Sequence, residues 1–191
     1  MAGRPPAACL VFYLPFRPMS EPIPRLTPQG ALAQEAQREL ALTRRLLERV
    51  PTDRFGWQPH PKSMPLGTLA AHMANLVSFL VISLQGPETD MAAGPFPPAP
   101  AGTDEVLRRF DLNGENLRRA LTDVDDATFW EVWRMRYGER PVAALPRIMV
   151  ARVLVLNHLI HHRGQLSVYL RLLDIPLPAI YGGSADEAPP R

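Results

Sequence analysis

The stretch 156–173, LNHLIHHRGQLSVYLRLL, constrains the fold more than any other part of the chain, because it sets two histidines within an apolar run of helical spacing. His158 and His162 are four residues apart, so at about 100° per residue both imidazoles lie on one helical face, one turn apart. That face also carries Val155, Leu159, Leu166, Tyr169 and Leu173. Buried imidazole nitrogens need partners, and a shared metal ion would satisfy both rings. The pattern therefore predicts a core-facing helix that carries half of a metal site.

Four long segments of the chain have helical spacing of their apolar residues, and irregular connections with prolines separate them. They predict helices over 28–50, 65–84, 103–121 and from about 142–145 to 173. Thr27 followed by Pro28 is typical of a helix start, and Ser63 is expected to cap the second helix. The segments predict an all-α fold, a four-helix bundle with irregular connections and a metal site between helices, in which the order of up and down helices stays open.

The connections between the predicted helices and the two chain ends lack the helical spacing of apolar residues. Residues 51–64 are irregular and apolar enough to cover one end of the bundle, and 85–102 form a proline-rich loop that could be a lid or a mobile edge. Residues 128–136 are aromatic and alternating, which predicts a short extended segment. We expect three parts: a flexible proline-rich leader over 1–26, one bundle domain over 27–187 and a tail over 188–191.

Composition narrows the class of protein. The chain has 191 residues, 46% of them hydrophobic, which is enough for one sizeable core. Its 21 basic and 19 acidic residues form no block of like charges, so charge gives no indication of nucleic-acid binding. The single cysteine, Cys9, excludes an intramolecular disulfide and fits a cytoplasmic protein.

The apolar stretch 7–16, AACLVFYLPF, superficially resembles part of an export signal. Pro15 interrupts it, no small-x-small cleavage site follows, and it is too short to span a bilayer. We therefore expect neither export nor a membrane anchor. Met19 opens a more ordinary polar leader, so residues 1–18 could precede the natural start.

A third histidine is available to the predicted metal site. His72 lies between Leu69 and Leu76 at helical spacing, so it points into the core or along its margin. Facing helices of a bundle are about 8–10 Å apart, a gap that two imidazoles and an ion can fill. His72, His158 and His162 are therefore the candidate ligands. The alternative is that each is an ordinary core histidine, since His-x-x-x-His also occurs on helices without a metal.

Two further histidines are weaker candidates. His161 is three residues from His158 but about 100° around the helix from His162, so we place it at the pocket rim, behind the ligands or on the surface. His60 lies in a loop flanked by prolines. Neither is predicted to be a ligand.

Four other polar residues could support the site. Asn75 is one turn after His72, and Gln165 follows His162 by three residues, so either could orient a ligand or the substrate, or simply make a structural hydrogen bond. Asn113 lies in an apolar stripe, where it could bond locally or line a pocket. Arg163 could attract an anionic thiol, or form a salt bridge that is solvated or faces an interface.

The segment 158–187, HLIHHRGQLSVYLRLLDIPLPAIYGGSADE, closely resembles the C-terminal signature of the DinB family, also called DinB/YfiT-like metalloenzymes. The family pattern His-x-x-His-His-Arg-Gly-Gln is present at 158–165, the first-histidine region is matched by LGTLAAHMANL at 66–76, and the upstream tryptophan by Trp57. Gly183 replaces a proline of the usual tail. The resemblance covers about 28–187 and implies a four-helix bundle with a divalent ion on His72, His158 and His162.

The resemblance also implies a chemistry. Three neutral imidazoles leave at least one coordination position open, as in catalytic sites; zinc is the default ion, and nickel, iron or manganese are alternatives. Related families include S-transferases that use small thiols such as bacillithiol, mycothiol or glutathione, so we expect thiol transfer to a small-molecule substrate, with no catalytic base assigned. The alternatives are a non-catalytic metal- or ligand-binding bundle of a stress response and a metal-dependent hydrolase. A homodimer through an exposed helical face is also expected.

Overall fold

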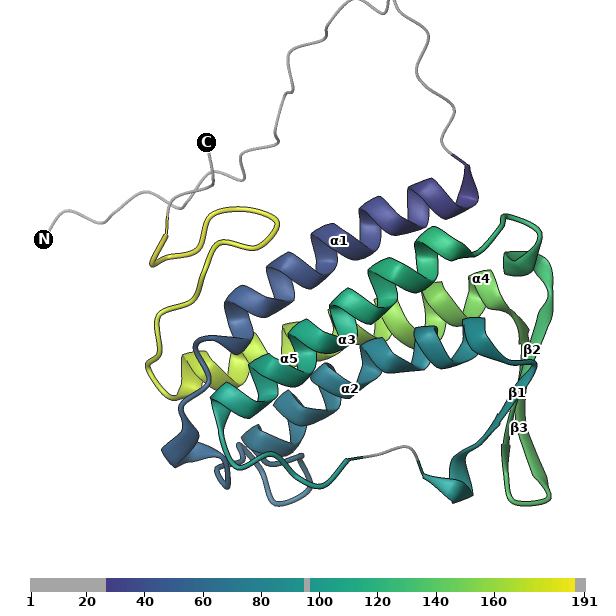
Figure 1. The fold of residues 1–191 in the computed structure, drawn as a ribbon. Coiled ribbons are helices and arrows are strands. Elements are labelled where there is room, and N and C mark those ends of the chain that lie inside the picture. The colour runs from purple at the N-terminus through teal and green to yellow at the C-terminus, as the bar shows by residue number, and fades with distance from the viewer. Residues whose placement is uncertain (1–26, 95–96, 188–191) are drawn as a thin grey trace, which may run out of the picture.

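The computed structural model describes residues 27–94 and 97–187, in which four long helices pack together and a small sheet stands at one end of the bundle (Figure 1). The helices are α1 (Pro28–Leu47), α2 (Leu66–Gln85), α3 (Thr103–Asp123) and α5 (Asn157–Leu172). α2 and α3 run in one direction and α1 and α5 in the other, so the order is up-down-down-up. The predicted leader over 1–26 and tail over 188–191 lie outside the described residues.

The start of α1 is as predicted. The side-chain oxygen of Thr27, the N-cap, accepts a hydrogen bond from the N–H of Gly30 at 3.1 Å. The predicted apolar stripe is buried from Leu32 onwards, but Glu39 is buried where Leu40 was expected, and Leu40 is only half-buried. A charged side chain therefore lies inside the bundle and needs a partner there.

α2 begins at Leu66 without the predicted cap from Ser63. Its first N–H groups bond backbone carbonyls instead: Leu66 donates to Trp57 at 2.8 Å, and Gly67 donates to Phe55 at 2.9 Å. A Cβ at position 67 would lie 2.6 Å from the Phe55 ring, so glycine allows this close approach. The Ser63 prediction was wrong because the preceding connection supplies the acceptors that a cap would supply.

α2 is the central helix of the core. Its predicted stripe is buried and joins one apolar cluster with residues of α1, α3 and α5; the buried members are Leu66, Leu69, Met73, Leu76 and Leu80. Among the described residues, α2 is the helix long and apolar enough to cross a membrane by length and composition. Most of it is buried inside the bundle, which is the arrangement of a core helix.

A small three-stranded sheet corrects the all-α prediction. Its strands are β1 (Glu88–Asp90), β2 (Val132–Tyr137) and β3 (Arg140–Pro146), in the order β1-β2-β3. β1 pairs parallel with β2, and β2 pairs antiparallel with β3. The predicted loop over 85–102 therefore contains a strand and a 3₁₀ turn, Met91–Ala93, and the predicted extended segment is β2 preceded by a 3₁₀ turn, Thr128–Trp130.

The last helix starts later than predicted and is not uniform. Residues 142–146 belong to β3, and the helical path begins with α4 (Arg147–Met149), continues as a π-helix over Val150–Leu156 and becomes α5 at Asn157. A π-helix accommodates more residues per turn than an α-helix, so it changes the face that the following helix presents. It ends two residues before His158.

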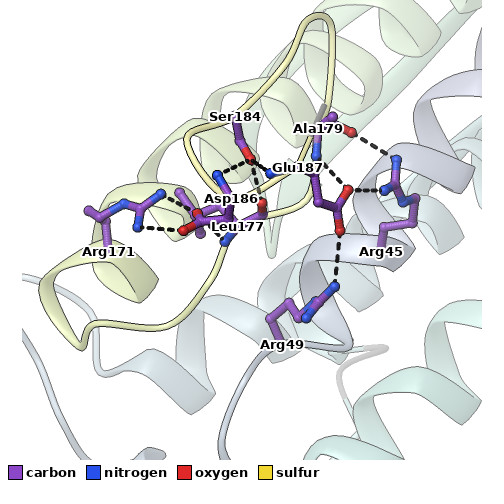
Figure 2. A network of polar contacts seen from close by, with 8 residues as sticks. All are labelled: Arg45, Arg49, Arg171, Leu177, Ala179, Ser184, Asp186 and Glu187. Carbon is purple, nitrogen blue, oxygen red and sulfur yellow. Dashed lines mark hydrogen bonds and ion pairs between the residues drawn. The ribbon is translucent and has the colours of Figure 1, made fainter. Parts of the chain in front are cut away.

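The chain after α5 returns across α1 at the end of the bundle away from the sheet (Figures 1 and 2). Glu187 lies between Arg45 of α1 and Arg49 just after that helix, with oxygen–nitrogen distances of 2.6 and 3.2 Å. Asp186 pairs with Arg171 of α5 at 2.5 Å. The segment with the resemblance to the DinB tail therefore ties α1 to α5 and lies outside the histidine cluster.

Candidate metal centre

Three histidines from two helices converge in the middle of the bundle. The Nε2 atom of His158 lies 3.5 Å from Nε2 of His72 and 2.8 Å from Nε2 of His162. The ligand atoms of the three rings all lie within 4.8 Å of one another. His72 comes from α2, and the other two histidines come from one face of α5, one turn apart. This is the arrangement expected from the spacing of the residues, with facing helices supplying the two halves.

Gln165 orients one of the three rings. Its Oε1 lies 2.7 Å from Nδ1 of His162. A carboxamide oxygen only accepts hydrogen bonds, so Nδ1 of His162 carries the proton and Nε2 keeps its lone pair. That lone pair points towards the other two histidines, as a metal ligand requires.

Burial favours the neutral form of two of the three histidines. Desolvation first, and then the neighbouring His162 and His158, with which protonation would bring like charges together, lower the pKa of His72 to about 4. Desolvation also lowers the pKa of His162, against the opposing effect of its bond to Gln165. At neutral pH both imidazoles are therefore unprotonated, which is the form that binds a metal ion.

The donor set fits a divalent ion. Zinc–nitrogen bonds of about 2.0–2.1 Å in a tetrahedral site place ligand nitrogens about 3.3 Å apart. The Nε2 separations of 3.5 and 2.8 Å are close to that value without movement of the helices. In the tautomer that carries its proton on Nδ1, each ring offers the Nε2 lone pair, and one ion between the rings could bind all three. His72, His158 and His162 are thus the residues that would hold it.

One side of the cluster opens into a pocket of about 360 Å³. His72, His158 and Asn75 line it, and the remaining lining residues are apolar or aromatic. A larger cavity of about 720 Å³ lies between α1 and α3, but it shares no lining residue with the first and has no histidine. The smaller pocket is therefore the one that could present a substrate to the candidate centre.

The other predicted site residues lie in different places. Asn75 lines the pocket, and Gln165 contacts His162. His161 is exposed, with its ring centroid 5.0 Å from that of His162. The Asn113 amide donates to the carbonyl of Ala74 at 2.9 Å and so braces α3 against α2 outside the pocket. This bond between two helices is neither the local hydrogen bond nor the place in a pocket lining that the sequence suggested for Asn113.

Arg163 lies in a buried network instead of a solvated salt bridge. Its Nη2 donates to Oε2 of Glu39 and to the hydroxyl of Tyr181, each at 2.7 Å. The Tyr181 hydroxyl in turn donates to Glu39 at 2.6 Å. Arg163 is only 3% exposed and does not line the pocket. Consecutive helical residues point in directions about 100° apart, so Arg163 meets Glu39 of α1 while the neighbouring His162 meets the other histidines.

The pocket residues from the sheet end were missed by sequence reasoning. Met91 follows β1, Met135 and Tyr137 belong to β2, and Val142 belongs to β3. Long-range strand pairing brings them to the histidines, and no local spacing indicates it. The available signal was the presence of large apolar residues in segments that are otherwise polar and irregular.

Comparisons with known proteins agree with this architecture. A DinB-like protein from Bacillus cereus ATCC 10987 has a similar crystal structure, with a TM-score of 0.65 and 20% identity over 81% of this chain and 98% of that one. A DinB-like protein from Bacillus subtilis matches with a TM-score of 0.63 and 15% identity over 78% and 96% of the two chains. No protein with a curated description matches the sequence.

The family assignment rests on the sequence match, since likeness at this level of identity shows the fold alone. Residues 35–166, more than two thirds of the chain, match the DinB superfamily. The matched range includes α2, the sheet and the part of α5 that carries His158 and His162. The chain therefore belongs to the DinB superfamily.

Proposed function

We propose that this protein is a metal-dependent enzyme that transfers a low-molecular-weight thiol to a small-molecule electrophile. The observation that carries the proposal is the convergence of three histidines, two of which, His72 and His158, line a largely apolar pocket. A three-histidine donor set leaves a coordination position for an exchangeable ligand, and zinc is the ion that such a set holds most readily, with nickel, iron or manganese as alternatives.

A divalent ion held there would supply Lewis acidity that lowers the pKa of a bound thiol towards neutrality. Residues of the chain would hold the ion and orient the groups around it. His72, His158 and His162 hold the ion, Gln165 fixes the orientation of one ring, and Asn75 offers a carboxamide within the pocket. In the transfer, the thiol loses its proton to solvent, a sulfur–carbon bond forms and the leaving group departs with its electron pair.

Elemental analysis of protein purified without a histidine tag tests the first half of this proposal. We expect about one divalent ion per chain, as in other three-histidine sites. His72→Ala, His158→Ala and His162→Ala should each lose tight binding, whereas His161→Ala is the matched control and should keep it, because its ring is exposed. Tight one-to-one binding in all three ligand variants would overturn the ligand assignment.

A turnover screen tests the second half. The metal-loaded protein is incubated with haloaromatic and epoxide electrophiles in the presence of bacillithiol, mycothiol or glutathione. The proposal expects conversion that needs both thiol and metal and that disappears with His158→Ala. Conversion by water alone would identify a hydrolase, and full metal occupancy with no conversion by any thiol would count against transfer.

A non-catalytic metal-binding role is the second candidate, and one observation favours it. In the described part of the chain, no Asp or Glu joins the histidine cluster or lines the pocket, so no carboxylate is placed to act as a general base. This candidate expects tight metal binding with no conversion of any electrophile by thiol or water.

A further inference from the structure

The pocket beside the histidines is apolar along most of its wall. Phe79 from α2, Leu154 from the π-helix and Met135 from β2 line it, and the lining residues with polar groups are His72, Asn75, His158 and Tyr137. Among the residues that the structure describes, no lysine, arginine, aspartate or glutamate contributes to the lining. A charged substituent placed there would lose its hydration without gaining a partner.

The sheet aims apolar side chains at this pocket. Met135 pairs with Ala143 on β3, but the next pair joins Arg136 to Pro141, so Val142 is an extra residue in β3. This is a β-bulge, which bends a strand and redirects the side chain of the extra residue. Val142 lines the pocket together with Met135. The bulge therefore contributes a wall that a regular hairpin would not.

Two of these wall residues are exposed to an unusual degree. Tyr137 is 63% and Val142 is 52% exposed, although both line a concave surface with Met91 beside them. Leaving apolar surface open to water in a pocket is unfavourable, and an apolar ligand would cover it. The volume of about 360 Å³ falls within the range of small-molecule sites.

We propose that this pocket binds an uncharged, apolar or aromatic molecule, with the β2–β3 hairpin as its specificity wall. The inference deepens the proposed function and rests on it only for the identity of the occupant as the electrophilic substrate. An apolar electrophile would then lie in the pocket with its reactive carbon at the histidine end. The charged groups of the thiol would stay outside the apolar lining, where they remain hydrated.

The test uses two dyes with the same aromatic body. N-phenyl-1-naphthylamine is neutral, and 1-anilinonaphthalene-8-sulfonate is the same molecule with a sulfonate. Fluorescence titration of the full chain, both as purified and after treatment with EDTA, should give one saturable site for the neutral dye. In the EDTA-treated protein, the sulfonated dye should bind at least about tenfold more weakly, because the pocket has no cation to pair with it.

Val142→Glu should weaken binding of the neutral dye by about tenfold or more, because it places a charge in the wall. Val168→Glu is the matched control, since Val168 on α5 is 57% exposed and lies outside the pocket. Equal binding of the neutral dye by wild type and Val142→Glu would overturn the proposal, as would equal affinity for the two dyes in the EDTA-treated protein. Dye binding requires neither metal nor turnover, so this outcome is independent of whether the proposed transfer holds.

Discussion

At the residue scale, the histidine cluster was accessible from the sequence because it depends on local spacing. His158 and His162 share a face through the geometry of one helix, and His72 lies in the apolar stripe of another. The buried ion pair of Arg163 was not accessible, because its partner Glu39 interrupts an apolar stripe and looks like a surface residue of α1. Spacing predicts which face a residue shares but not which distant residue it meets.

The contact of Gln165 with His162 predicts an effect on metal affinity. Gln165→Leu removes the acceptor that fixes the ring, and such outer contacts change metal affinity by about 10–100-fold. Gln165→Glu keeps an acceptor at that position and should retain tight binding. Competition with a chromophoric zinc chelator measures both, with Gln37→Leu on the exposed face of α1 as the matched control. Unchanged zinc affinity in Gln165→Leu would show that the ring needs no support.

The lowered pKa of His72 predicts an acid sensitivity of the metal-free protein. Its pKa is about 4 in the folded chain and 6.5 in the unfolded chain, so only the unfolded chain binds this proton between those values. The contribution of His72 to the free energy of unfolding should therefore be complete above about pH 6.5 and should be lost as the pH drops towards 4. His162, whose pKa is also lowered, acts in the same direction.

Urea unfolding of EDTA-treated protein at several pH values between 7.5 and 4.5 measures this dependence. His72→Gln should show a shallower fall over the same window, because it removes one of the titrating groups. Most carboxylates titrate below this window, so they do not account for the effect. The same slope in His72→Gln and wild type would contradict the assignment.

At the element scale, the four helices were predictable and the sheet was not. β1 is the tripeptide Glu-Thr-Asp, which has no strand-like apolar alternation. It is held as a strand by pairing with β2 and by Arg136, which pairs with both Glu88 and Asp90. The π-helix could not be predicted from the sequence either, because its residues, VARVLVL, are compatible with an α-helix. Both features depend on contacts between segments far apart in the chain.

The end of α2 offers a prediction at this scale. Its last turn has no basic residue, and Arg147, the first residue of α4, supplies the missing cap. The buried guanidinium donates to the carbonyls of Ser83 at 2.6 Å and Gly86 at 3.1 Å, and pairs with Glu131. Arg147→Ala leaves these acceptors unpaired and should lower the free energy of unfolding by about 2–4 kcal/mol.

Arg147→Lys should recover only part of this stability, because one ammonium group cannot reproduce the planar set of donors. The control is Arg152→Ala, which removes a half-exposed pair with Glu35 and should cost less than about 1 kcal/mol. Chemical denaturation of the three variants gives the comparison. Equal losses for Arg147→Ala and Arg152→Ala would exclude a capping role for Arg147.

At the scale of the whole molecule, the bundle followed from four apolar stripes, but its helix order did not. The connection from α2 to α3 runs back along the bundle, so the two helices are parallel, and this return cannot be read from the composition of the loop. The C-terminal segment likewise closes the fold across α1 and α5 through charged residues (Figure 2). These are properties of packing, which the helical spacing of each segment leaves undetermined.

The Glu39–Arg163 pair predicts how strongly the fold depends on a buried charge network. It joins α1 to α5, and Tyr181 adds the C-terminal segment. Removing one charge leaves the other buried and unpaired, so Arg163→Met or Glu39→Leu alone should lower the free energy of unfolding by about 3–5 kcal/mol. The double variant replaces both charges with apolar side chains and should be near neutral by comparison, within about 1–2 kcal/mol of wild type.

A double-mutant cycle by urea unfolding measures this coupling directly. Zinc stoichiometry should stay at its wild-type value in the double variant, because the Arg163 side chain contacts α1 and Tyr181, and not the histidines. If the two single losses simply added in the double variant, the residues would act independently and the network would not be a unit. If the double variant kept its stability but lost zinc, the network would be needed to position α5 for metal binding. The folded bundle alone would then not be enough to place His162.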